Sequence, residues 1–102
     1  MRRGEIWMAQ VGRKRRPVLV VTRSEVLDVR RLVTVVEVTT SVRGLAAEVG
    51  LEQGDFGLDE QSVVNCDGLH TVPQSSLTSY VGEVPAEVMT KVCSAVTYAI
   101  GC

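Results

Sequence analysis

The feature that most constrains the fold is a series of short, valine-rich runs separated by glycine-containing connections. Valine is branched at Cβ, and its stiff side chain packs better on a pleated strand than in a helix. Five or six short strands with tight turns in a chain of this length favour a small barrel or sandwich. The predicted strands are Glu5–Ala9, Pro17–Arg23, Leu32–Thr39, Ala46–Leu51 and Ser62–Asn65 continuing towards Val72, and the connecting glycines are Gly12, Gly44, Gly54, Gly57 and Gly68.

The end of the chain has the periodicity of a helix. Apolar residues recur every fourth position from Val88 to Ile100, which places them on one helical face. Pro85 suits a first helical turn and Gly101 suits the position after the last one, so we expect a closing helix of about four turns. A shorter helical turn is predicted over Gln74–Ser79. The predicted fold is therefore mainly β with a C-terminal helix.

Length and composition indicate one globular domain. A chain of 102 residues has room for a single core, so we expect one domain over residues 1–102. The sequence has no apolar run of the ~20 residues that a membrane helix needs, and its start, MRRGEIWMAQ, lacks the apolar stretch of a signal peptide. We therefore expect a cytoplasmic protein that does not enter a membrane.

The charges are unevenly distributed along the chain. Residues 1–43 hold ten of the eleven basic residues and four acidic ones, whereas residues 44–102 hold only Lys91 and eight acidic residues. The net charge of −1 conceals this segregation. The pattern is compatible with a local basic site for a polyanion and disfavours an extended surface that follows a phosphate backbone.

The three cysteines and the single tryptophan are expected to have structural roles. The cysteines are too few and too scattered for a disulfide framework, and they lack the paired spacing of a zinc site. We expect Cys66 and Cys93 to be small core residues and Cys102 to lie at a frayed end. Trp7 lies in the first predicted strand, where a core position is favoured over a base-stacking one.

Two polar segments are candidates for chemistry. The basic run Arg13–Arg16 leads directly into an apolar strand, so the base of Arg16 should be rigid and its guanidinium could face a cleft. The hydroxyls of Thr39, Thr40 and Ser41 follow another long apolar strand. The residues alone leave two simpler interpretations open: a solvated basic turn, and hydroxyls that satisfy turn backbone groups.

Taken in order, these segments resemble the MazF/PemK family of toxin endoribonucleases over nearly the whole chain. The opening RRGEIWMAQ is similar to the first strand of the family, and KRRPVLVVTR matches its most specific motif. The stretch VTVVEVTTSVRG fits the family's strand that ends in a threonine-rich turn. The segments DEQSVVNCDGLHTVPQSSL and VGEVPAEVMTKVCSAV resemble the late strand and the closing helix.

The resemblance implies a fold, partners and a site. It implies an SH3-like small β-barrel of the CcdB/PemK type and a symmetric homodimer that binds single-stranded RNA in a groove. It also implies a cognate MazE-like antitoxin whose tail occupies that groove. By position, Arg16 and Thr39 correspond to the family's catalytic arginine and threonine. The loop that gates the groove would be Val11–Arg15, which is shorter than in many members.

The implied reaction requires only a few protein groups. RNA supplies its own nucleophile, the 2′-hydroxyl, so the enzyme has to align it with phosphorus and stabilise charge. Arg16 would hold phosphoryl oxygens with its planar fork, and Thr39 would donate a hydrogen bond or orient the 2′-hydroxyl. We expect no metal ion or other cofactor, and products with a 2′,3′-cyclic phosphate and a 5′-hydroxyl.

Further residues are predicted to contact RNA. Asn65 and Asp67 are two apart on one predicted strand, so they should face the same side and could read base edges or form a local network. His70 could contact RNA, face solvent or transfer a proton. The full set of predicted RNA-binding residues is Lys14, Arg15, Thr40, Ser41, Arg43, Asn65, Asp67 and His70.

Two other functions are compatible with the same fold. A gyrase inhibitor of the CcdB type would use its C-terminal helix as the binding surface, and it would need no arginine and threonine in one cleft. A non-catalytic nucleic-acid-binding barrel would use the basic run Arg13–Arg16 to bind phosphate. The presence of both Arg16 and Thr39 favours the endoribonuclease.

Overall fold

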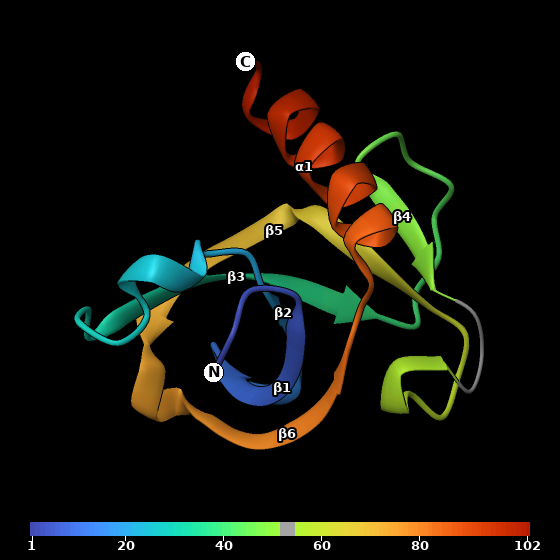
Figure 1. Cartoon of the computed structure of the whole chain (residues 1–102). Helices are drawn as coiled ribbons and strands as arrows, with labels where there is room; N and C mark the ends of the chain where they lie inside the picture. Colours follow the sequence, from blue (N-terminus) through green and yellow to red (C-terminus); the bar gives the residue numbers. More distant parts are fainter. Residues whose placement is uncertain (52–54) are drawn as a thin grey trace.

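The computed structural model describes residues 1–51 and 55–102 and consists of six strands, three short 3₁₀ turns and one long helix (Figure 1). The strands are β1 (Glu5–Val11), β2 (Lys14–Val20), β3 (Leu32–Thr39), β4 (Glu48–Leu51), β5 (Ser62–Pro73) and β6 (Leu77–Glu83). The 3₁₀ turns are η1 (Ser24–Val26), η2 (Asp55–Gly57) and η3 (Gln74–Ser76), and the helix is α1 (Ala86–Ile100).

The strands form one antiparallel sheet in the order β4-β5-β3-β2-β1-β6. The sheet coils around the β1–β2 hairpin, and α1 lies across β5 and β4 (Figure 1). This arrangement confirms the predicted mainly β fold with a C-terminal helix and is compatible with a small barrel. The barrel is not closed by hydrogen bonds, because β4 and β6 remain the two edge strands.

The segment η2 packs against the β6 edge through two glycines. A Cβ atom on Gly82 of β6 would collide with the carbonyl oxygen of Phe56, and one on Gly57 would collide with that of Val81. The two backbones are thus in direct contact, and only glycine permits this approach at both positions. This contact covers the β6 edge, which would otherwise present unpaired backbone groups.

The core has two parts on either side of the coiled sheet. The larger part lies under α1, where Val92 is completely buried in a cluster that includes side chains from β1, β2, β3 and β5. The smaller part lies between the hairpin and the start of β3 and includes Val18, Val33 and Val35. Alternate residues of β2 therefore enter different parts of the core, as the two-residue period of a strand requires.

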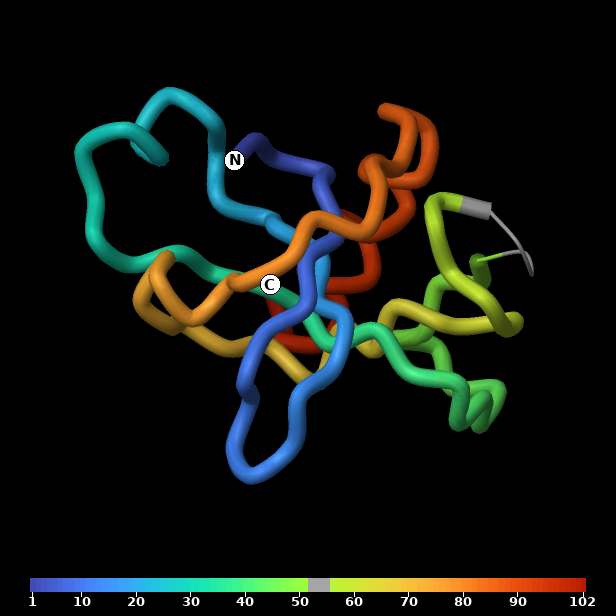
Figure 2. The backbone as a smooth tube through the Cα atoms, turned by 90° about the horizontal axis from the view of Figure 1, so that it is seen from below, coloured from blue at the N-terminus to red at the C-terminus, as the bar shows by residue number. Residues whose placement is uncertain are grey.

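The connection between the first two strands is shorter than the expected loop of about Val11–Arg15. β1 and β2 are joined by only two residues, Gly12 and Arg13, and Gly12 takes a φ of 63° at the first position of the turn. That is the position where a type II′ hairpin turn places glycine. Once such a tight turn forms, the basic run pairs with β1 and becomes strand, in the hairpin that projects from the body in Figure 2.

The prediction of a helical turn over Gln74–Ser79 is only partly correct. The turn η3 ends at Ser76, and strand β6 follows from Leu77, where the sequence analysis expected no strand. Only Leu77 of this strand is fully buried, and its pairing with β1 is interrupted by two register shifts. The strand therefore lacks the alternation of apolar and polar residues that identifies one in a sequence.

Gly68 was expected in a connection and lies inside β5. The pairing of β3 with β5 jumps between Val36, which faces Leu69, and Glu37, which faces Asn65. The extra residues on β5 form a bulge that contains Gly68, a common place for glycine within a strand. Gly54 lies outside the described residues.

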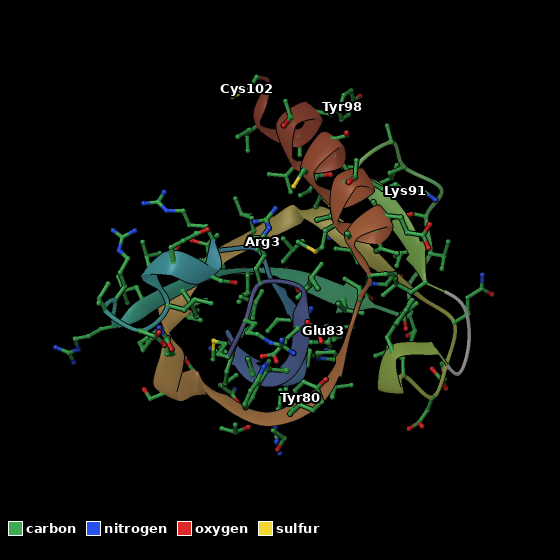
Figure 3. The ribbon with its side chains drawn as sticks, viewed as in Figure 1. Arg3, Tyr80, Glu83, Lys91, Tyr98 and Cys102 are labelled. Carbon is green, nitrogen blue, oxygen red and sulfur yellow. The ribbon has the colours of Figure 1, made fainter. Side chains whose placement is uncertain are left out.

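The predicted roles of the cysteines and of Trp7 are partly confirmed. Cys66 is 1% exposed and belongs to the core, and Cys102 is exposed at the end of the chain. The core prediction for Cys93 is wrong, because its side chain faces solvent on α1. Trp7 is half-buried and packs edge-to-face on the exposed Tyr80, labelled in Figure 3, with ring centroids 5.8 Å apart.

We expect Gly82→Ala to lower the free energy of unfolding by about 1–3 kcal/mol, since the new methyl group would separate β6 from Phe56. Gly50→Ala is the matched control, because a Cβ at that position of β4 meets no atom within 4 Å. Urea denaturation at one fixed protein concentration compares the two variants. Equal stability of both variants would contradict the proposed role of this contact.

Burial raises the pKa of the Cys66 thiol to about 11, so it stays protonated and unreactive at neutral pH. We expect iodoacetamide to modify Cys102 in the folded protein and to spare Cys66 until denaturant is added, as read by mass spectrometry. The unfolded chain has the lower thiol pKa, so this group makes the folded state less stable as the pH rises from the ordinary thiol value towards 11.

Candidate active site

A cleft of about 260 Å³ lies at the end of β3, bounded by β2, β5 and the segment that joins β3 to β4. The β1–β2 hairpin and the 40–46 segment project to the same side of the molecule in Figure 2. Nine residues line the cleft: Arg16, Glu37, Thr39, Ser41, Arg43, Leu45, Glu48, Asn65 and Asp67.

Arg16 enters the cleft from β2, opposite Ala9 of β1. Its side chain is 31% exposed, and its Nη1 donates to Oε1 of Glu37 in an ion pair. Its Nε–H is buried and has no hydrogen-bond partner among the described residues. The guanidinium is thus held at the cleft by one of its two terminal nitrogens and keeps donor capacity unused.

Glu37 lies between Arg16 and His70. While Oε1 accepts from Arg16, Oε2 lies 2.8 Å from Nε2 of His70 on β5, and the Glu37 side chain is only 16% exposed. The bulge in β5 makes room for this carboxylate, because a Cβ on Gly68 would collide with Oε2 of Glu37. The Glu37 carboxylate of β3 therefore contacts one side chain from each neighbouring strand, Arg16 from β2 and His70 from β5.

Thr39 is the last residue of β3 and shares the cleft with Arg16. Its Oγ1 accepts a hydrogen bond from the backbone N–H of Ser41 at 3.1 Å. Because the hydroxyl oxygen acts here as acceptor, its own hydrogen remains available to donate to another group. The bond also fixes the start of the segment that leaves β3.

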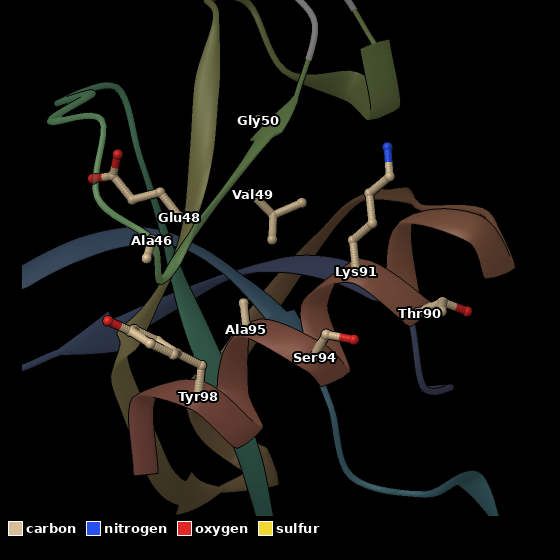
Figure 4. A pocket seen from close by; sticks show the side chains of 9 residues that line it. All are labelled: Ala46, Glu48, Val49, Gly50, Thr90, Lys91, Ser94, Ala95 and Tyr98. Atoms are coloured by element: carbon tan, nitrogen blue, oxygen red, sulfur yellow. The ribbon is translucent and has the colours of Figure 1, made fainter. Parts of the chain in front are cut away.

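Glu48 of β4 anchors the outer wall of the cleft. Its Oε1 accepts from the backbone N–H groups of Arg43, Gly44 and Leu45 at 3.1, 2.9 and 3.3 Å. One carboxylate thereby orders three consecutive residues that lack strand partners. In Figure 4 the Glu48 carboxylate points towards this segment and away from α1.

Asn65 and Asp67 line the opposite wall, from β5. Oδ1 of Asn65 accepts from the backbone N–H of Asp67 at 3.2 Å. The expectation that both side chains face the same side is confirmed, because both line the cleft. Within the described residues, the N–H donors of the Asn65 side-chain amide have no partner.

Of the ten predicted site residues, the structure brings six into this cleft: Arg16, Thr39, Ser41, Arg43, Asn65 and Asp67. Arg15 lies on the opposite side of β2 and donates to the hydroxyls of Thr78 and Ser79 at 2.9 Å. Lys14 is exposed on the hairpin, and Thr40 is exposed beside the cleft without lining it. His70 reaches the cleft only through Glu37.

Three residues that were not predicted as site residues also line the cleft: Glu37, Leu45 and Glu48. Glu37 carried a signal that could have identified it, because it is the single charged residue in the apolar run VTVVEVTT. A charge in a buried strand requires a partner, so its position indicates a nearby cation. Glu48 had no comparable signal, because its partners are backbone N–H groups.

A second hollow, of about 560 Å³, lies between β4 and α1 (Figure 4). It contains none of the ten predicted site residues, and Lys91 and Tyr98 of α1 stand at its rim. Within residues 1–51 and 55–102, no three His, Cys, Asp or Glu side chains gather in a way that could hold a metal ion. None of the helices in the described part of the chain is long and apolar enough to cross a membrane.

Comparison with known proteins identifies relatives over nearly the full length. Residues 2–100 match the model of the family described as PemK-like, MazF-like toxin of type II toxin-antitoxin system. The probable endoribonuclease MazF5 of Mycobacterium tuberculosis is 37% identical over 103 residues, with 98% of this chain and 93% of the relative covered.

Two solved structures have the same fold. The Mycobacterium tuberculosis toxin MazF-mt6 superimposes with a TM-score of 0.89 at 38% identity, covering 95% of this chain and 96% of that one. An endoribonuclease in complex with its cognate antitoxin from mycobacterial species also gives a TM-score of 0.89, at 27% identity, covering 99% of this chain and 95% of that one.

We expect Glu48→Ala to increase the rate of tryptic cleavage after Arg43 by at least about tenfold, because three backbone N–H groups lose a charged acceptor. Glu87→Ala, an exposed carboxylate on α1, is the control and should leave the rate unchanged. Time-resolved digestion followed by mass spectrometry measures this rate. Similar rates in both variants would mean that Glu48 does not order the segment.

Proposed function

The chain belongs to the PemK-like, MazF-like family of type II toxins, and we propose that it is an endoribonuclease that cleaves single-stranded RNA with Arg16 and Thr39. The relatives named as endoribonucleases support the activity. The observation that carries the assignment of residues is that Arg16 and Thr39 line one small cleft, although they come from different strands. A gyrase inhibitor acting through its C-terminal helix would not need this pairing.

Arg16 binds the scissile phosphate. Its guanidinium is permanently charged, and its fork matches two phosphoryl oxygens. In the free protein, one Nη is paired with Glu37 while the Nε–H has no partner among the described residues. A bound phosphate offers acceptors for the remaining donors, and the attraction grows as negative charge develops in the transition state.

Thr39 acts on the same phosphodiester. Its hydroxyl accepts from the Ser41 backbone N–H and so presents its hydrogen to the cleft, where it donates to a phosphoryl oxygen or orients the ribose. The 2′-hydroxyl of the RNA attacks the adjacent phosphorus, and the 5′-oxygen leaves. The products are a 2′,3′-cyclic phosphate and a 5′-hydroxyl, and the reaction proceeds without a metal ion or cofactor.

The neighbouring residues hold the nucleotides on either side. Ser41, Arg43, Asn65 and Asp67 line the cleft and contact bases or backbone. The exposed residues Lys14 and Thr40 and the half-exposed His70 extend this surface, whereas Arg15, on the other side of β2, would contact only RNA that passes around the hairpin. The cleft also contains three carboxylates, which repel phosphate groups. Its arginines are therefore the groups that attract RNA, and the cleft does not bind along an extended stretch of the phosphate backbone.

The cellular setting follows from the family. Residues 1–102 form one toxin domain, which acts as a homodimer in the cytoplasm, where its RNA substrate is. A cognate MazE-like antitoxin inhibits it by occupying the groove. The solved complex of a mycobacterial endoribonuclease with its cognate antitoxin, which has the same fold, supports this partner. Release of the toxin then inhibits translation and growth.

We expect Arg16→Ala and Thr39→Ala each to lower the cleavage rate of a mixed single-stranded RNA pool by ~10²–10³-fold, because each removes a donor to the reacting phosphate. The assay contains EDTA, and circular dichroism and size-exclusion chromatography verify that fold and dimer survive. Mapping of the cleaved ends gives the recognition sequence and the end chemistry together.

Arg31→Ala is the matched control, since this exposed arginine lies just before β3, at the end of that strand opposite the cleft. It should retain the wild-type rate. Full cleavage by both site variants would refute the proposed site, whereas cleavage that stops in EDTA would refute the metal-free mechanism alone.

A further inference from the structure

We infer that Glu37 is the general base of this endoribonuclease and takes the proton of the attacking 2′-hydroxyl, while Arg16 and His70 hold its carboxylate in place. The inference rests on the proposed function and adds to it the group that accepts the proton. It is carried by the position of Glu37 between Arg16 and His70 on the wall of the cleft.

The reaction requires a proton acceptor that Arg16 and Thr39 do not supply. The hydroxyl of the ribose is a weak nucleophile until its proton is removed. The Arg16 guanidinium carries only donors and stays charged. The Thr39 hydroxyl is no stronger as a base than the ribose hydroxyl itself, and its oxygen already accepts from Ser41.

Three carboxylates line the cleft, and two of them are poorly placed. The Oε1 atom of Glu48 already accepts hydrogen bonds from three backbone N–H groups of residues 43–45. Asp67 is exposed, and no hydrogen bond of the described residues links its carboxylate to Arg16 or Thr39. Glu37 pairs with Arg16 directly and lies two positions before Thr39 on β3, hence on the same face of the strand.

The surroundings of Glu37 hold its carboxylate for this task. Arg16 binds Oε1, His70 Nε2 lies 2.8 Å from Oε2, and the glycine at position 68 leaves the space that the carboxylate occupies. Each carboxylate oxygen has two acceptor positions, so one remains free on each. Arg16 keeps its contact with Oε1 while its remaining N–H groups bind the phosphate, so the free acceptor position of Oε1 lies beside the bound nucleotide.

The step balances without a further reactant except water. The O2′–H bond breaks and its proton passes to Oε1 of Glu37, while the O2′ electron pair forms a bond to phosphorus. The bond from phosphorus to the 5′-oxygen breaks, and this oxygen takes a proton from water. The resulting hydroxide removes the proton from Glu37, which restores the carboxylate. His70 is a positioning residue in this scheme.

Several charged groups lie close to Glu37, and together they influence how the cleavage rate depends on pH. Arg16 from β2 and His70 from β5 contact Glu37, and Arg43, Glu48 and Asp67 line the other walls. The diagnostic feature is therefore whether the rise of the cleavage rate with pH, the ascending limb of the pH profile, requires a carboxylate at position 37.

The test uses an RNA oligonucleotide that contains a mapped cleavage site, in single-turnover reactions from about pH 3 to about pH 8, a range that spans the ordinary carboxyl pKa of about 4. We expect Glu37→Gln to lower the rate by ~10²–10⁴-fold and to abolish the ascending limb. The same oligonucleotide with a 2′-deoxyribose at the cleaved position cannot react, and the variant should bind it with equal or higher affinity in fluorescence anisotropy.

Two further variants keep the result interpretable. Glu37→Asp retains a carboxylate one methylene further from the cleft and should keep the ascending limb at a reduced rate. Glu60→Gln removes an exposed carboxylate before β5 and should behave as wild type. Circular dichroism verifies that all variants are folded.

Three results would overturn the inference while the proposed function stands. Glu37→Gln could retain the rate and the limb, or cleave faster because Glu37 only restrains Arg16. It could also lose affinity for the deoxy oligonucleotide as strongly as it loses rate, which would make Glu37 a positioning residue for Arg16. If the wild-type protein cleaves no RNA at all, the proposed function itself fails, and this inference fails with it.

Discussion

The pairing of β3 with both β2 and β5 is the constraint on which the cleft depends. Glu37 pairs with Val18 of β2 and with Asn65 of β5 in the sheet, and its carboxylate reaches Arg16 on one neighbour and His70 on the other. A slip of one residue in either pairing would turn these side chains to the opposite face. The register of the central strands therefore decides whether these side chains share a cleft.

The charges at this point are placed where burial is partial. Glu37 is 16% exposed and Arg16 is 31% exposed, so both remain in contact with solvent while they face each other. A completely buried pair would lose more hydration energy than its attraction returns, and an exposed pair would be too mobile to hold a geometry. At the edge of the core this ion pair thus combines a fixed geometry with access to solvent.

Three glycines and one further carboxylate make other close contacts in the fold. The glycine at position 68 accommodates the carboxylate of Glu37, and the contact of Gly57 and Gly82 covers the β6 edge, which is remote from the cleft in the sheet order. Glu48 orders the outer wall through backbone N–H groups. Gly68 and Glu48 thus help the cleft to keep its shape, whereas Gly57 and Gly82 allow a close contact at the far edge of the sheet.

The sequence alone determined the strand-rich core, the closing helix and the two polar segments that contain Arg16 and Thr39, because these rest on local periodicity and on motifs within a few residues. It did not reveal strand β6, whose exposed residues lack alternation, or the hairpin that turns the basic run into strand. Only the tertiary structure showed Glu37 between Arg16 and His70, because strand register and the bulge at Gly68 bring together three positions that are distant along the chain. Local sequence specifies which residues form strands, whereas contacts across the sheet decide which side chains share a cleft.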